Sequence, residues 1–214
     1  MFKGEHNHSY RWKGVLFSLL FLSFTLACSE EDATEDEYAN WQQRNEVYFA
    51  SLQDSLERNP AQWQRIKNYS FDDAVEAVEP SSDYIYVKVI SSGTETDSPA
   101  YTDSVRVIYQ GRLIPTTSYP EGLVFDGTVY GEFTPATSAT SKQLVSRMIE
   151  GYATALQHMH RGDYWRVYIP SDLGYGSTGS GSTIPGYSTI IFDLMLIDFA
   201  PTGETLPVWS SRQR

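Results

Sequence analysis

Apolar side chains recur at steps of three and four residues from Tyr38 onward, until the Asn59-Pro60 pair interrupts them. This spacing is typical of a helix with one apolar stripe. Six side chains form the stripe: Tyr38, Trp41, Tyr48, Phe49, Leu52 and Leu56. Trp63 and Ile66 prolong the pattern and predict a second short helix. The stripe has to be buried, either against the rest of the chain or in an interface with a second copy or a partner.

After Pro80 the period of the pattern changes to two, which is typical of β-strands. Alternation predicts strands in the runs DYIYVKVISSG, SVRVIYQGRL, YWRVYIP and TIIFDLMLIDF. In the second run, Val105, Val107 and Tyr109 share one face. Residues 115–142 are rich in Pro, Thr, Ser and Gly, and they predict loops around one short strand at Leu123–Asp126.

One segment of this second half returns to helical spacing. The run from Gln143 to Met159 carries a single apolar stripe, formed by Leu144, Met148, Ile149, Tyr152, Leu156 and Met159. Gly162 follows closely and is typical of a helix end. Several strands covered by one helix predict an α+β domain.

The first 27 residues have the pattern of an export signal. Lys3, Arg11 and Lys13 precede an apolar run of 13 residues, VLFSLLFLSFTLA, which ends at Ala27. A helix that spans a bilayer needs about 20 apolar residues, so a cleaved signal is favoured over a membrane span.

Cys28, the only cysteine in the chain, follows this run directly. Its position resembles the lipobox of bacterial lipoproteins, which predicts lipidation of Cys28; the alternative is a buried structural cysteine. Residues 29–37 hold six acidic side chains in nine, typical of a solvated tether, and resemble a surface-export signal. We therefore expect a protein anchored by lipid in the bacterial outer membrane, facing the periplasm or the cell surface.

Charge excludes one class of partner. Residues 1–27 contain three basic residues and one acidic residue, so the remaining chain carries 13 Lys and Arg against 26 Asp and Glu, a net charge of −13. Binding to nucleic acid depends on cationic contacts to phosphate, and is not expected here. Attachment to the membrane is expected through the lipid anchor.

The glycines Gly174, Gly176 and Gly179 match the pattern G-x-G-x-x-G of dinucleotide-binding loops. That pattern needs a helix directly after the loop, whereas Pro185 and a β-branched run follow here. The His158 and His160 pair has no cysteine near it and is interpreted as a solvated helix end. No cofactor and no metal are expected.

The order of the motifs VRVIYQGRL, GLVFDGT, MIEGYATALQ, YWRVYIP, GYG, IP and FDL resembles the FK506-binding-protein (FKBP) family of peptidyl-prolyl cis-trans isomerases. The likeness covers about residues 82–200. It implies a twisted antiparallel sheet of about five strands wrapped around one short helix, preceded here by a helical arm. The predicted parts are the signal peptide (1–27), the lipidated cysteine and acidic tether (28–37), the helical arm (38–80), the isomerase domain (81–202) and a C-terminal tail (203–214).

The resemblance also implies a set of site residues lining an apolar cleft that grips a proline ring. The residues at family pocket positions are Tyr109, Phe125, Asp126, Ile149, Tyr152, Tyr175, Ile184 and Phe192, with Phe133 and Met148 as further substrate contacts. Tyr152 stands where the family commonly has a tryptophan as the pocket floor.

The implied activity is rotation about X-Pro bonds in exported or surface proteins. The rotation barrier is about 20 kcal/mol, because amide resonance is lost in the twisted state. An acceleration of about 10⁴ requires only about 5.5 kcal/mol, which a dry pocket and fixed donors can supply without a nucleophile. The implied partners are proline-containing polypeptides and macrolides of the FK506 type, and the arm is a candidate dimer contact. The alternative is a weakly active or inactive domain of this fold that binds or chaperones other chains.

Overall fold

The computed structural model describes residues 36–71, 80, 83–129, 133–134 and 137–209. All of them belong to one compact unit that spans residues 35–214. The predicted signal peptide, Cys28 and most of the acidic tether lie outside the described residues. No helix in the described part is long and apolar enough to cross a membrane.

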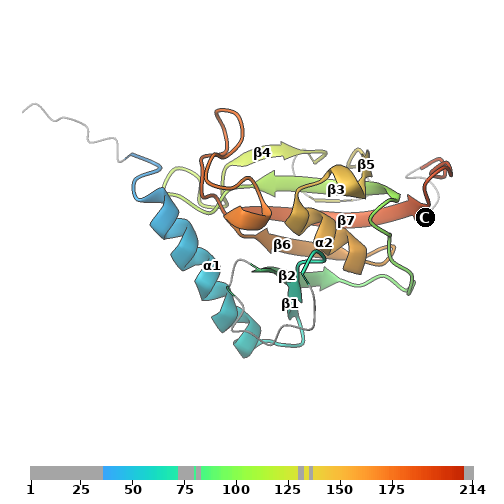
Figure 1. Ribbon diagram of the computed structural model, residues 1–214, viewed down its shortest axis with the longest axis horizontal. Coiled ribbons are helices and arrows are strands. Elements are labelled where there is room, and N and C mark those ends of the chain that lie inside the picture. The colour runs from blue at the N-terminus through green and yellow to red at the C-terminus, as the bar shows by residue number, and fades with distance from the viewer. Residues whose placement is uncertain (1–35, 72–79, 81–82, 130–132, 135–136, 210–214) are drawn as a thin grey trace, which may run out of the picture. The chain divides into compact units, whose positions relative to one another are not determined.

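One antiparallel sheet dominates this unit (Figure 1). Its strands are β1 (Trp63–Lys67), β2 (Tyr84–Ser91), β3 (Ser104–Arg112), β4 (Val124–Gly127), β5 (Ser141–Leu144), β6 (Tyr164–Ile169) and β7 (Ile190–Ala200). The order across the sheet is β1-β2-β6-β7-β3-β4, and β5 pairs with β3. β7 pairs with β3 along nearly its whole length and with β6 through Ile190–Met195, and it is the longest and most continuously apolar strand.

Helix α2 (Glu150–His158) lies across one face of this sheet (Figure 1). Its residues from Gly151 to Leu156 are all buried. A side chain at position 151 would come within 2.4 Å of the Ile169 side chain, so glycine there lets the helix approach β6 closely. The predicted α+β class, an antiparallel sheet with a covering helix, is confirmed.

The helix predicted from Gln143 to Met159 is shorter than its stripe suggested. Residues 141–144 form β5, in which Gln143 pairs with Val105, and a 3₁₀ turn (Val145–Arg147) separates the strand from α2. The backbone N–H of Val145 donates to the carbonyl of Asp103 at 3.1 Å. Pairing with β3 therefore overrides the helical spacing. The four-residue step from Leu144 to Met148 is compatible with a strand followed by a turn as well as with a helix.

The second short helix predicted around Trp63 and Ile66 is also wrong, since these residues form the edge strand β1. β1 pairs with β2 through five residues, with Trp63 opposite Lys88. Trp63 stacks on Tyr168 with ring centroids 5.4 Å apart, and Ile66 is buried. With β1 and β5 added, the sheet has seven strands rather than about five.

The N-terminal arm forms helix α1 (Trp41–Arg58), which lies beside the edge strand β1 (Figure 1). Its predicted stripe joins the main core, with Trp41, Phe49 and Leu52 buried. Trp41 Nε1 donates to Ser188 Oγ at 2.9 Å, and Asn45 Oδ1 accepts from the Thr189 N–H at 2.8 Å. The stripe is thus buried against the rest of the chain, so a dimer contact through this same stripe is not needed to cover it.

Candidate functional site

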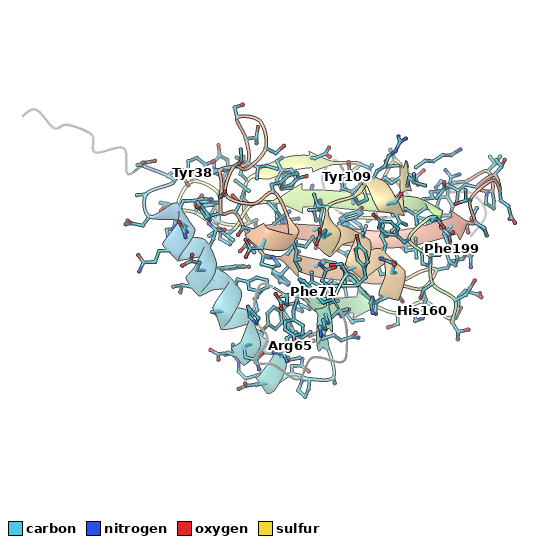
Figure 2. The ribbon with its side chains drawn as sticks, in the orientation of Figure 1. Tyr38, Arg65, Phe71, Tyr109, His160 and Phe199 are labelled. Atoms are coloured by element: carbon cyan, nitrogen blue, oxygen red, sulfur yellow. The ribbon has the colours of Figure 1, made fainter. Side chains whose placement is uncertain are left out.

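A pocket of about 320 Å³ lies where the start of α2 meets β3, β4, β5 and β7. Ten residues line it: Tyr109, Phe125, Asp126, Gln143, Arg147, Met148, Ile149, Tyr152, Tyr175 and Phe192. Tyr109, labelled in Figure 2, comes from β3 and faces the side of the sheet that α2 covers. Eight of the ten residues named from the sequence are therefore brought together in one cavity.

Four aromatic rings form the apolar body of the pocket. Phe192 on β7 is central, with its ring centroid 4.8 Å from that of Tyr152, 5.9 Å from that of Phe125 and 6.2 Å from that of Tyr109. The contacts with Tyr152 and Phe125 are edge-to-face, the geometry that aromatic pairs prefer. The rings fit because residue 111 on β3 is glycine, where a Cβ would lie 2.6 Å from both Phe125 and Phe192.

One charged group, the carboxylate of Asp126 on β4, is held at the side of this apolar surface. Tyr109 Oη donates to Asp126 Oδ2 at 2.8 Å, and the Gly127 N–H donates to Asp126 Oδ1 at 2.8 Å. Burial, followed by the hydrogen bond to Asp126 and its negative charge, raises the pKa of Tyr109 well above its usual range. Tyr109 therefore stays a protonated donor, and the carboxylate keeps one orientation.

Two further hydrogen-bond donors of the pocket are available to bind a ligand. The hydroxyl of Tyr175, which follows the short 3₁₀ turn Ser171–Leu173, has no hydrogen-bond partner in the described part of the chain. Burial and the nearby Asp126 charge raise its pKa, which keeps this hydroxyl protonated. The N–H of Ile149, the residue that caps α2, likewise has no partner among the described residues. Both groups can donate to the carbonyls of a bound peptide.

Two residues of the pocket, Gln143 and Arg147, were missed by the sequence analysis. The apolar spacing predicts Gln143 as the start of a helix, but in β5 it lies opposite Val105, which faces the core beneath α2. Paired residues of neighbouring strands point to the same face, so Gln143 is directed into the pocket. Only the pairing of β5 with β3 reveals this, and the apolar periodicity carries no signal for it.

Two residues predicted for the site do not line this pocket. Phe133 stacks on Tyr164 with centroids 4.4 Å apart, on the opposite face of the sheet with Ile108 and Met195. Side chains alternate along a strand, and Ile108 therefore faces away from its neighbour Tyr109. Ile184 is buried in the main core, and its backbone forms an isolated bridge with Ser180.

The glycine-rich loop after Tyr175 runs through turns into β7, with no helix between Gly174 and Ile190. Gly176 and Gly179 have φ of 63° and 74°. A Cβ at Gly179 would lie 2.1 Å from the carbonyl oxygen of Ile184, so glycine allows the two limbs of the loop to meet. No group of three or more metal-ligating side chains occurs among the described residues.

Comparison with known proteins places this pocket in a recognised type of domain. Residues 95–197 match the model of the FKBP-type peptidyl-prolyl cis-trans isomerase family. An FKBP-type 22 kDa peptidyl-prolyl cis-trans isomerase of Escherichia coli is 36% identical over 123 residues, which cover 58% of this chain and 53% of that protein. The outer membrane protein MIP of Legionella longbeachae is 37% identical over 110 residues, 51% of this chain and 42% of that protein.

A solved structure supports the fold independently. The crystal structure of a peptidyl-prolyl cis-trans isomerase from Pseudomonas syringae pv. tomato superposes with a TM-score of 0.53 and 23% identity, covering 78% of this chain and 98% of that one. At this identity the likeness concerns the fold alone. The chain spans about half the length of the two curated relatives described above.

Proposed function

The chain belongs to the FKBP-type peptidyl-prolyl cis-trans isomerase family through its residues 95–197, and from this premise we propose that it accelerates cis-trans isomerisation of X-Pro bonds in exported or surface proteins. One observation carries the proposal. Four aromatic rings, a fixed carboxylate and two unpaired donors converge on a cavity of about 320 Å³, with no nucleophile activated by a neighbouring base. A site of this kind binds an apolar ring and orients the amide beside it.

The apolar surface supplies the first part of the mechanism. A proline ring packed against Phe192, Tyr152 and Phe125 is removed from water. The planar X-Pro amide is more polar than its twisted form, so exclusion of water favours the twisted form. Rotation about the bond then needs no covalent step and no proton transfer.

Fixed donors supply the second part. We assign to the Tyr175 hydroxyl and the Ile149 N–H the binding of carbonyl groups on either side of the proline, because both residues line the pocket and both groups lack a partner in the described chain. The Ile149 N–H is fixed by the backbone at the start of α2, so it stabilises the twisted geometry without reorganisation. Each net hydrogen bond contributes about 1 kcal/mol. A few such contacts and burial of the ring can therefore lower the rotation barrier by the about 5.5 kcal/mol that an acceleration of about 10⁴ requires.

The direct test uses residues 29–214, which contain the whole compact unit. Exchange between the cis and trans forms of a short Phe-Pro peptide is measured by NMR with and without micromolar protein. We expect an acceleration that an FK506-type macrolide suppresses, because both ligands need the same pocket. Binding of the peptide without acceleration would overturn the enzyme proposal and favour the inactive binding module.

We also propose that the protein works at the cell envelope, attached through lipidated Cys28. The apolar run before Cys28 and the acidic residues after it support this location, as does the name of the Legionella relative. Incorporation of labelled palmitate into the wild-type chain, and its loss in Cys28→Ala, is the expected result. Labelling that persists in Cys28→Ala would contradict the proposal, and protease treatment of intact cells would separate surface from periplasmic exposure.

A further inference from the structure

The side chain of Arg147 lines the pocket and is exposed, yet the protein itself makes no use of its charge. Among the described residues, its guanidinium has no hydrogen-bond partner, no ion-pair partner and no aromatic ring beside it. Every other arginine in the described part donates a hydrogen bond or stacks on a ring, namely Arg44, Arg58, Arg65, Arg106, Arg112, Arg161 and Arg166. The guanidinium of Arg147 is therefore available to a ligand of the pocket.

The local backbone keeps Arg147 beside the donor assigned to the bound peptide. Arg147 ends the 3₁₀ turn that begins at Val145, and the Met148 N–H donates to the Val145 carbonyl at 3.1 Å. Ile149, whose N–H is assigned to a carbonyl next to the proline, follows two residues later. Two residues span at most about 7 Å, so the long side chain of Arg147 reaches the residue that flanks the proline.

Neighbouring carboxylates do not neutralise Arg147. Glu150 accepts a hydrogen bond from Asn68 Nδ2 at 2.8 Å, which directs it away from Arg147. Asp126 is held by the two donors described above and forms no ion pair with Arg147. Strand β4, which carries Asp126, and strand β5, which precedes Arg147, pair with opposite ends of β3. The pocket therefore presents a fixed negative charge and a separate, unpaired positive charge.

A guanidinium is most specific for carboxylates. Its planar fork donates two parallel hydrogen bonds to the two carboxylate oxygens, and it stays protonated throughout the pH range of folded proteins. On a polypeptide ligand, the matching groups are the side chains of Asp and Glu. An amide can accept only one such bond, and an ammonium group is repelled.

We propose that Arg147 is a specificity-determining residue, which makes the pocket favour prolyl segments with Asp or Glu directly before or after the proline. The inference rests on the proposed function, since it assigns the prolyl ring to this pocket. The whole chain has a formal net charge of −11, so general attraction does not favour an acidic ligand. The preference is a local property of Arg147.

The test uses blocked peptides of equal length, in which one Glu stands directly before the proline, directly after it, or four residues away. Each peptide has a partner with Gln in place of Glu, and dissociation constants come from NMR titration. For at least one adjacent position, we expect Glu to lower Kd by about 5-fold to 12-fold relative to Gln, between a strong exposed ion pair and a weak hydrogen bond to a charged group. The distant Glu should give no gain. Equal Kd values for Glu and Gln at both adjacent positions, or an equal gain from the distant Glu, would overturn the proposal.

Substitutions assign the preference to Arg147. Arg147→Gln should bring the ratio of Kd values close to one, and Arg147→Glu should invert it, so that Lys beside the proline binds more tightly than Glu. Arg147→Lys keeps the charge without the planar fork and should keep part of the preference. Arg58→Gln removes the same charge from an exposed position outside the pocket, and the full preference should survive. A preference that persists in Arg147→Gln, or a wild-type preference for Lys imposed by Asp126, would overturn the proposal.

Affinity and rate separate this inference from the proposed catalysis. Exchange rates of the same peptides, corrected for the uncatalysed rate of each, give kcat/KM. A preference for adjacent Glu in Kd without acceleration supports the role of Arg147 and refutes the enzyme proposal. Acceleration with equal Kd values for the Glu and Gln peptides does the reverse.

Discussion

The hydrogen bond from Tyr109 to Asp126 joins the two central features of the pocket, its aromatic body and its single fixed charge. Tyr109 donates at 2.8 Å, and Arg147 is the one Lys or Arg among the residues that line the pocket. The Gly127 N–H is the second group that holds Asp126. Both contacts are local, since β3 and β4 are neighbouring antiparallel strands.

Removal of the Tyr109 hydroxyl should lower activity and leave the fold intact. We expect Tyr109→Phe to reduce kcat/KM for a Phe-Pro peptide by about 10-fold to 150-fold, the equivalent of one hydrogen bond to a charged group. The control is Tyr187→Phe, which removes the hydroxyl of an exposed tyrosine that does not line this pocket. Unchanged turnover in Tyr109→Phe would show that the orientation of Asp126 does not matter for the reaction.

Residues of the site differ in how far the sequence could predict them. Tyr109, Asp126 and Tyr175 are polar side chains in apolar or glycine-rich motifs whose order resembles a known family. That order was sufficient to predict that the three residues belong to one pocket. Gln143 required knowledge of which strand pairs with β3. The sequence predicts Phe133 as a substrate contact, but Phe133 lies between β4 and β5 and packs against Ile108 and Met195 on the other face of the sheet.

The strands show the same contrast at the level of whole elements. β2, β3, β6 and β7 were predicted because they are long enough for the period of two to be visible. β1 and β5 have five and four residues, and their apolar spacing fits a helix equally well. Their conformation is decided by pairing with β2 and β3, a tertiary effect that local pattern does not contain.

A buried asparagine contributes to the attachment of helix α1. Asn45 Nδ2 donates to the Trp41 carbonyl, and Asn45 Oδ1 accepts from the N–H of Thr189, which is itself buried. Asn45→Ala should lower the free energy of unfolding by about 1–3 kcal/mol, because the Thr189 N–H loses its partner. Gln43→Ala on the exposed side of α1 is the control, and both are measured by urea denaturation. An equal, small effect of the two variants would mean that α1 contributes little to the domain.

Across the whole unit, buried and half-buried tyrosines make stability sensitive to alkaline conditions. Burial is the largest cause of a raised pKa at Tyr48, Tyr109, Tyr152, Tyr164, Tyr168 and Tyr175. Each is protonated in the folded state at pH values where the unfolded chain ionises. Their contribution to stability is therefore complete below about pH 10, the usual tyrosine pKa, and is lost as pH rises toward the folded values.

The expected result is a Tm that is nearly constant from pH 7 to pH 9 and falls steeply above about pH 10. Absorbance at 295 nm should show the tyrosines with raised pKa ionising together with the loss of structure. A smooth titration of all tyrosines without loss of structure would contradict the burial of these side chains. Tyr152→Phe, which removes one buried phenol, should make the alkaline fall shallower.

The contacts between α1 and the segment before β7 have a consequence for biosynthesis. Trp41 and Ser188 are 147 positions apart in the chain, and Asn45 and Thr189 are 144 apart. During synthesis or export, the apolar stripe of α1 emerges long before the residues that cover it, and at about 5–20 residues per second this interval lasts on the order of ten seconds. β7, which carries Phe192, completes the sheet and the pocket in the same closing step. The apolar stripe of α1 is therefore not fully covered until Ser188 and Thr189 have emerged.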